Sequence, residues 1–186
     1  MKRHMIPAMV FAICVAAPSF AGNPFAGNPM VGGQKMYANK DIIDNAVHSA
    51  DHTTLVAAVK AAGLVDTLKG AGPFTVFAPT NEAFAKLPAG TVDTLLKPEN
   101  KDALVRILTY HVVPGRLTMA SLEKQIRDGG GMAELKTVSG GTLTASMQDG
   151  KLMLRDEKGG MSVVTIQNVM QSNGVIQVVD TVLMPN

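Results

Sequence analysis

Four closely spaced turn signals in the last third of the chain constrain its fold more than any other feature. They are Gly140-Gly141, Asp149-Gly150, Gly159-Gly160 and Asn173-Gly174. Asp-Gly and Asn-Gly are the strongest short-range hairpin signals, because both central residues of such a turn need a positive φ. The residues between the signals alternate apolar and polar side chains, as a strand does. We expect strands over residues 135–138, 142–147, 152–156, 163–170 and 175–184.

The preceding part of the chain has helical periodicity instead. Apolar residues recur three and four positions apart within 41–62, 98–110 and 118–127, and Pro79-Thr80 opens a further short helix. Residues 74–78 alternate as a strand, which must join the sheet from far away in sequence. A helix-rich front half and an antiparallel, strand-rich back half predict an α+β domain.

The N-terminus has the three parts of a secretory signal peptide. A basic start is followed by an apolar run from Met5 to Ala17 and by the small-x-small triplet Ser19-Phe20-Ala21. The apolar run is shorter than the roughly 20 residues that a membrane-spanning helix needs. We therefore predict that residues 1–21 are removed and that the mature chain has no transmembrane segment. Export to the periplasm or the extracellular space follows from this prediction.

Residues 22–38 predict a flexible linker rich in Gly, Asn and Pro. The sequence Ala21-Gly22-Asn23-Pro24-Phe25 is nearly repeated by the next five residues, and Asn-Pro and Gly-Gly steps favour turns over regular pairing. The folded domain is then expected to span residues 39–186.

Charge and cysteine content exclude several classes of function. The excess of two positive charges in the whole chain corresponds to Lys2 and Arg3, so the mature chain is neutral. With only 4% aromatic residues as well, it lacks the features of a nucleic-acid-binding protein. The single cysteine, Cys14, lies in the apolar run of the signal peptide. The mature chain therefore has no disulfide, no catalytic thiol and no cysteine-ligated zinc.

Catalytic and metal-binding patterns are weak. Asp44, His48 and His52 are spaced four apart and could face one cation on a single helix, but the chain is expected to break near residues 49–51 to cap the next helix. The sequence contains no Gly-x-Ser-x-Gly and no phosphate-binding glycine loop between a strand and a helix. We therefore expect that the protein is not an enzyme and that it binds no metal ion and no cofactor.

Three segments resemble one family. Residues 72–84, Gly-Pro-Phe-Thr-Val-Phe-Ala-Pro-Thr-Asn-Glu-Ala-Phe, are similar to the first conserved box of the fasciclin (FAS1) domain. Residues 108–115 resemble its tyrosine-histidine motif, and residues 173–185 resemble its second box. The order and spacing match from about Asn39 to Asn186, as in bacterial secreted single-domain members. The resemblance implies a β-wedge of two sheets with several short helices packed at one edge.

The resemblance also implies a function, which is adhesion to a cell-surface or matrix protein or glycan. In animal members the tyrosine-histidine motif is implicated in adhesion, so Tyr110 and His111 are the candidate binding residues. The residues themselves also favour a structural role, because a tyrosine ring and a histidine at a helix end are readily buried between apolar neighbours. Scattered methionines suit an alternative function, a periplasmic small-ligand or stress-related binding protein.

Overall fold

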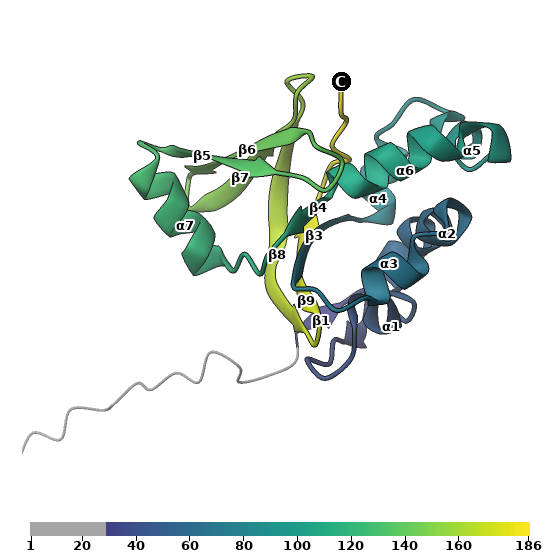
Figure 1. The fold of residues 1–186 in the computed structure, drawn as a ribbon, viewed down its shortest axis with the longest axis horizontal. Coiled ribbons are helices and arrows are strands. Elements are labelled where there is room, and N and C mark those ends of the chain that lie inside the picture. Colours follow the sequence, from purple (N-terminus) through teal and green to yellow (C-terminus); the bar gives the residue numbers. More distant parts are fainter. Residues whose placement is uncertain (1–28) are drawn as a thin grey trace, which may run out of the picture.

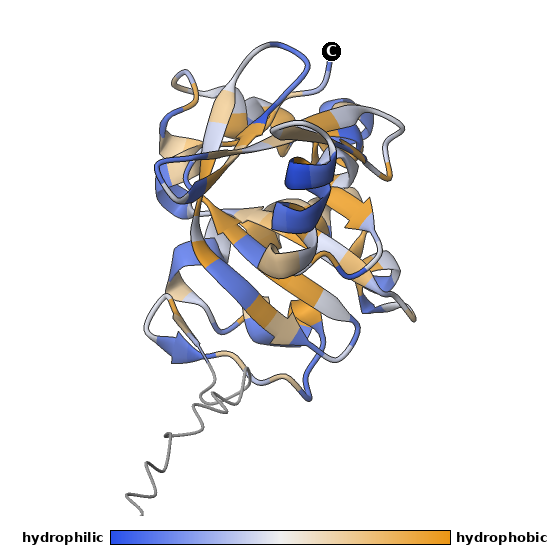
Figure 2. Ribbon diagram, turned by 90° about the vertical axis from the view of Figure 1, so that its left-hand side faces the viewer, coloured by the Kyte–Doolittle hydropathy of each residue, from blue (hydrophilic) through white to orange (hydrophobic). Residues whose placement is uncertain are grey.

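The computed structural model describes residues 29–186 of the chain. The expected signal peptide and the first part of the expected linker lie outside the described residues. A seven-stranded mixed sheet runs through the domain, with helices α1–α6 on one side and α7 on the other (Figure 1). Apolar residues concentrate on the strands and on the inner faces of the helices (Figure 2).

The strands and helices have the following bounds. The strands are β1 Met30–Val31, β2 Gln34–Lys35, β3 Phe74–Pro79, β4 Val112–Pro114, β5 Met132–Lys136, β6 Thr142–Gln148, β7 Lys151–Arg155, β8 Met161–Gln171 and β9 Gly174–Val179. The α-helices are α1 Ile42–Ala46, α2 Thr53–Ala62, α3 Val65–Lys69, α4 Asn81–Ala85, α5 Thr91–Leu95, α6 Lys101–Tyr110 and α7 Met119–Asp128. Two 3₁₀ turns, η1 Ala50–His52 and η2 Pro98–Asn100, precede α2 and α6.

The sheet has the order β4-β3-β9-β8-β7-β6-β5. The long strand β8 pairs with β7 through its first residues and with β9 through the rest, so the two halves of the wedge are continuous. Just beyond β5, the amide of Val138 donates to the carbonyl of Val112 at 2.8 Å, which brings the two outer strands together at one end. The predicted α+β wedge is confirmed, as a mixed sheet that nearly closes on itself.

The distant strand β3 joins the sheet as predicted, and it pairs in parallel with β9 and antiparallel with β4. It lies between β4 and β9, and its pairing with β9 runs from Phe74 opposite Gly174 to Pro79 opposite Val179. All six residues of β9 are buried, which agrees with the apolar residues on both of its faces. Both faces are covered because the sheet separates two hydrophobic cores.

Each core packs on one face of the sheet. On β3, Val76 and Ala78 point to the core beneath helices α1–α6, whereas Phe77 points into the wedge. Helix α7 fills the open side of the wedge with Met119, Leu122 and Ile126. The alternation along a single strand thus supplies both cores, as the period of two requires.

Several element bounds differ from expectation. Helix α3 and strand β4 were not predicted, because each is short and β4 is defined by pairing with the distant β3. Strand β9 ends at Val179 instead of continuing to residue 184. One reason is that a carboxylate oxygen of Asp180 accepts the amide of Val163 at 2.9 Å, where a backbone carbonyl would continue the ladder.

The expected flexible linker differs from the structure over residues 29–38. Strands β1 and β2 form a small antiparallel hairpin here, and the side chains of Val31 and Met36 are buried in the helix-side core. The turn residues Gly32 and Gly33 permit this hairpin, since both have a positive φ. Gly-Gly steps favour flexible segments, but here the two apolar residues flanking the turn hold the segment on the domain.

The parallel contact between β3 and β9 depends on the absence of a side chain at Gly174. A Cβ atom there would lie 2.1 Å from the carbonyl oxygen of Phe74. We expect Gly174→Ala to reduce the free energy of unfolding by about 3 kcal/mol, measured by urea denaturation, because backbone in a central strand pair cannot give way cheaply. The matched control is Gly150→Ala, which meets open space and costs only its positive φ, about 1 kcal/mol. Equal losses in both variants would contradict the steric argument.

Candidate functional site around the Tyr110-His111 pair

Tyr110 is the last residue of α6, and its side chain crosses into the wedge. The residue is 0% exposed. Its hydroxyl donates to the carbonyl of Thr142 at 2.8 Å and accepts the amide of Glu157 at 3.1 Å. Burial raises the pKa of the Tyr110 hydroxyl to about 12, so the group stays protonated and available as a donor. One side chain therefore connects α6 to the β5–β6 and β7–β8 turns.

His111 connects the same helix end to the C-terminal segment. It is 2% exposed, and its Nδ1 lies 2.8 Å from the carbonyl of Ile107 while its Nε2 accepts the amide of Leu183 at 3.0 Å. These partners define the tautomer, because only a protonated Nδ1 can donate to a carbonyl. Burial lowers the pKa of His111 to about 4, so the ring is neutral at pH 7.

Neither side chain of the pair reaches solvent. The family resemblance implied that Tyr110 and His111 are candidate binding residues, whereas their residue types also favoured a structural role. Their burial and hydrogen bonds agree with the structural role. A binding partner therefore cannot contact Tyr110 or His111 directly. The pair can affect binding only by holding a nearby surface in place.

That surface consists of residues 136–142, Glu157 and Asn186, and we call it the YH-supported surface. One carboxylate oxygen of Glu157 accepts the amide of Thr142 at 2.9 Å, and the other accepts the amide of Asn186 at 3.2 Å. These two N–H groups hold the pKa of Glu157 below its ordinary value. Val138, 44% exposed, is the large apolar side chain of the surface. The surface thus combines one apolar residue with fixed polar groups, which sequence reasoning did not identify because three separate segments form it.

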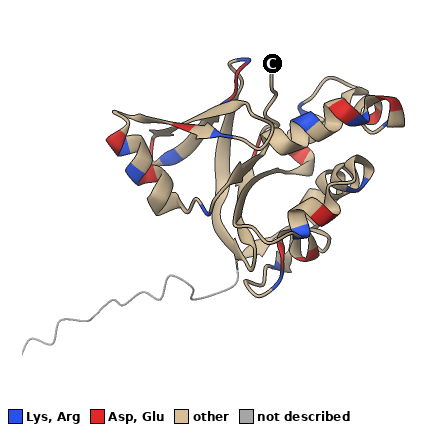
Figure 3. Cartoon of the chain, viewed as in Figure 1, with Lys and Arg blue, Asp and Glu red and all other residues tan. Residues whose placement is uncertain are grey.

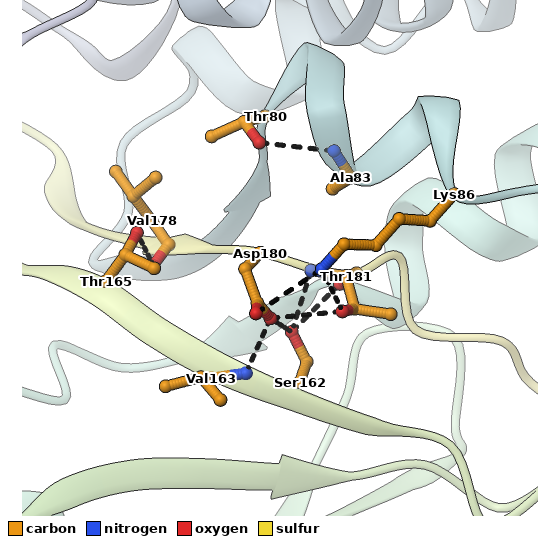
Figure 4. A network of polar contacts seen from close by, with 9 residues as sticks. All are labelled: Thr80, Ala83, Lys86, Ser162, Val163, Thr165, Val178, Asp180 and Thr181. Carbon is orange, nitrogen blue, oxygen red and sulfur yellow. Dashed lines mark hydrogen bonds and ion pairs between the residues drawn. The ribbon is translucent and has the colours of Figure 1, made fainter.

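A second junction links the first box to the end of β9 (Figure 4). The hydroxyl of Thr80 accepts the amide of Ala83 at 3.2 Å and caps α4, as the sequence predicted. The carboxylate of Asp180 lies 3.4 Å from the ammonium of Lys86 and also accepts from Val163 and Thr181. The hydroxyl of Ser162 donates to the Thr181 carbonyl at 2.9 Å. These contacts fix where α4 leaves the sheet, so this junction is part of the scaffold.

The structure does not bring Asp44, His48 and His52 together. The ring of His48 bonds the backbone carbonyl of Asp44, and the Asp44 carboxylate instead pairs with Lys69 at 2.7 Å. His52 lies on η1 and is buried, because the chain breaks between α1 and α2. Within residues 29–186, no three His, Cys, Asp or Glu side chains are placed to hold a metal ion.

Acidic and basic residues are interspersed on the outer faces of the helices (Figure 3).

The sequence pointed to His52 only as a possible metal ligand and did not predict its buried, unpaired ring nitrogen. Its Nδ1 lies 2.9 Å from the hydroxyl of Ser49, and its residue lines a cavity of about 40 Å³ in the helix-side core. Among the described side chains, its Nε2 is the one buried nitrogen or oxygen without a hydrogen bond. Burial lowers the pKa of His52, although the nearby carbonyl of Ala78 opposes this shift. The residue is therefore a neutral imidazole on an apolar wall.

The fold places the protein in the class of fasciclin-type domains. A solved FAS1 domain pair from the insect cell adhesion molecule Fasciclin I matches with a TM-score of 0.69 and 19% identity, over 78% of this chain and 51% of that chain. The sequence model of the fasciclin domain matches residues 50–185. The chain therefore belongs to the fasciclin domain family, and the resemblance noted from its three segments is confirmed.

Curated relatives are bacterial as well as animal. Protein sll1483 of Synechocystis is 51% identical over 144 residues, covering 77% of this chain and 73% of that protein. The cell surface glycolipoprotein MPB83 of Mycobacterium bovis is 38% identical over 122 residues, covering 66% of this chain and 48% of that protein. Within residues 29–186, none of the helices combines the length and the apolar character that crossing a membrane requires.

Proposed function

We propose that this protein is an exported, non-enzymatic binding module that attaches to a cell-surface or matrix protein or glycan. Family membership supports this function, since a structural relative is described as an insect cell adhesion molecule and a bacterial relative as a cell surface glycolipoprotein. The signal peptide predicted for residues 1–21 supports export to the periplasm or beyond the cell.

The observation that carries the proposal is the construction of the YH-supported surface. Tyr110 holds the carbonyl of Thr142 and the amide of Glu157, and Glu157 in turn holds Asn186. Three chain segments are thus held together, and the first of them carries the exposed side chain of Val138. A preorganised surface loses little conformational freedom on binding, which favours recognition of a partner. In this view Tyr110 and His111 act as positioning residues for the contact surface.

The proposal predicts that Val138→Asp reduces attachment. We expect the purified variant to bind host cells and matrix preparations about tenfold more weakly than the unchanged chain, because a charge replaces the apolar centre of the contact. Saturable binding should be measured with a labelled chain, alongside the melting temperature. Val138 is exposed, so its replacement should leave the melting temperature within a few degrees.

Met132→Asp is the matched control. Met132 is 59% exposed and lies six residues earlier, about 20 Å away along an extended chain. It should bind as the unchanged chain does. Loss of binding in Met132→Asp alone would move the contact to the exposed face of β5 around Met132, and saturable binding unaffected by either change would exclude the YH-supported surface.

A second candidate function is the binding of a small ligand, which is the alternative drawn from the sequence. The observation that favours it is the cavity beside His52, whose walls are almost wholly aliphatic. This function involves the opposite side of the sheet from the wedge core. His111 also lines this cavity, but the YH-supported surface itself does not.

A further inference from the structure

We propose that the space beneath the β1–β2 hairpin is a binding site for a small apolar molecule that carries one uncharged hydroxyl group. In this site the hydroxyl group of the ligand bonds Nε2 of His52. The apolar part of the ligand takes the positions that the side chains of Val31 and Met36 occupy in the structure described above. The proposal deepens the second candidate function and is independent of the adhesion proposal.

The first step of the argument is the chemistry of the cavity. It is lined by aliphatic residues from α1, α2, α3, β3 and β9, together with Val31 and Met36 from the hairpin segment. Lys60 is its one charged lining residue at neutral pH, and that side chain is exposed at the rim. A charged ligand group would therefore be buried without a partner, which is strongly disfavoured. An uncharged, mostly apolar molecule fits the walls.

The second step is the unused hydrogen-bonding capacity of His52. The residue is 3% exposed, and its Nδ1 is engaged by Ser49. Buried polar atoms are nearly always hydrogen-bonded in folded proteins, and Nε2 is the exception among the described side chains. The carbonyl of Ala78 lies near the ring, but Nε2 makes no hydrogen bond with it. Ser49 can donate to Nδ1 or accept from it, so Nε2 can serve in either role. A hydroxyl group is both donor and acceptor and satisfies either case.

The third step is the size of the cavity and the means of entry. A volume of about 40 Å³ holds a water molecule or two, whereas a cavity that takes benzene has roughly 150 Å³. An organic ligand therefore requires Val31 and Met36 to move. Both belong to the hairpin segment, whose strands have two residues each, and such hairpins are marginally stable by themselves.

The fourth step is that the hairpin has few attachments to the rest of the domain. The carbonyl of Gly32 accepts the amide of Ala50 at 3.4 Å, a long hydrogen bond. The side-chain amide of Asn45 bonds the amide and the carbonyl of Tyr37, at 3.0 and 2.7 Å. The hairpin also lies outside residues 50–185, the part that matches the fasciclin domain. It can therefore act as a plug on a scaffold of the fasciclin type.

Gly32 provides a way to lift this plug by a substitution at a residue that does not itself line the cavity. A Cβ atom on Gly32 would lie 2.6 Å from both the Asp51 amide nitrogen and the Ser49 hydroxyl oxygen, so Gly32→Ala must displace the hairpin tip. Gly33 has a similar positive φ, but its Cβ would meet open space. Gly33→Ala therefore carries the same backbone strain without the steric displacement and is the matched control.

The test uses the purified full chain and the fluorescent probe N-phenyl-1-naphthylamine, displaced by 1-hexanol or by hexane. The chain has no tryptophan to interfere with probe fluorescence. We expect saturable binding at one site, and about tenfold tighter binding to Gly32→Ala than to Gly33→Ala, because opening the plug is no longer part of the binding free energy. Equal affinity of the two variants, or no saturable binding by any of them, would overturn the proposal.

His52→Asn tests the polar contact. Asparagine keeps a polar atom near the position of Nδ1 for Ser49 but removes Nε2, so displacement by 1-hexanol should weaken about tenfold while displacement by hexane stays the same. In the unchanged chain, 1-hexanol should shift the ¹⁵N resonance of His52 Nε2 and leave that of the exposed His48 unmoved. An unmoved His52 resonance would refute the assigned contact, even if His52→Asn failed to fold. Failure of this test would leave the attachment of the YH-supported surface to cells unaffected.

Discussion

Replacing Tyr110 by alanine is expected to lower the free energy of unfolding by about 4 kcal/mol, one of the largest effects of any single change in this chain. Truncating a buried aromatic ring generally costs about 3–5 kcal/mol, since it removes contacts and leaves a cavity. At Tyr110 the ring also packs against Gly141, so closely that a Cβ atom added to this glycine would lie 2.6 Å from the ring edge. Chemical denaturation with urea at pH 7 measures the loss.

Tyr110→Phe separates the ring from its hydroxyl. Phenylalanine keeps the packing but leaves the Thr142 carbonyl and the Glu157 amide without their partner, at a cost of about 1–3 kcal/mol. If the YH-supported surface depends on that hydroxyl, amide hydrogen exchange at Thr142 and Glu157 should accelerate in Tyr110→Phe. Unchanged exchange and unchanged stability in this variant would show that the turns are held by other contacts.

Acidification should destabilise the protein between pH 6.5 and 4, by about 3 kcal/mol in total. The pKa of His111 is about 4 in the folded protein and 6.5 in its ordinary state. Below pH 6.5 the unfolded chain takes up a proton that the folded chain refuses, so the free energy of unfolding falls by up to about 1.4 kcal/mol for each pH unit. Above pH 6.5 this residue contributes no pH dependence. The lowered pKa of His52 acts in the same direction.

Carboxylates act in a different pH range and can be separated from this effect. Asp180 and Glu157 have pKa values held below their ordinary ones, so the stability that they contribute is present above pH 4.5 and is lost at lower pH. Urea midpoints measured at intervals from pH 7.5 to 4.5 therefore report mainly on the histidines. His111→Asn should show a flatter acid limb than the unchanged chain, and replacement of the exposed His48 should leave the slope as it is. A flat profile in the unchanged chain would contradict a neutral, buried His111.

The elements that could be predicted from sequence are those whose signals are local. The hairpin at Asp149-Gly150 was predicted correctly, because the geometry of such a turn depends on its two central residues, and both have a positive φ. The hairpin expected at Asn173-Gly174 also forms, but its central residues are Ser172 and Asn173, and Gly174 is the first residue of β9. The parallel direction of β3 beside β9 and the existence of β4 were not, since both depend on partners far away in the chain. The hairpin at residues 30–35 was mistaken for a linker because Gly-Gly also occurs in flexible segments.

The candidate site also has one part that local sequence signals predict and another that depends on distant partners. The tyrosine-histidine motif was identified from its sequence, and its burial agreed with its apolar neighbours. The surface that it supports could not be predicted, because residues 136–142, Glu157 and Asn186 become neighbours only in the folded sheet. His52 was considered as a metal ligand, whereas its position in an apolar wall depends on the break between α1 and α2.

The place of β9 in the sheet determines how the protein can fold as it is synthesised. The strand that pairs with β3 on one side and with β8 on the other is the last strand of the chain. Until residues 174–179 have left the ribosome, the strands of the large sheet can form only the β3–β4 pair and the β5–β8 sheet, each with an unpaired strand edge. Such edges promote aggregation. The domain therefore cannot be completed before β9 is available, and a chain terminated at residue 173 would lack the strand that unites its two halves.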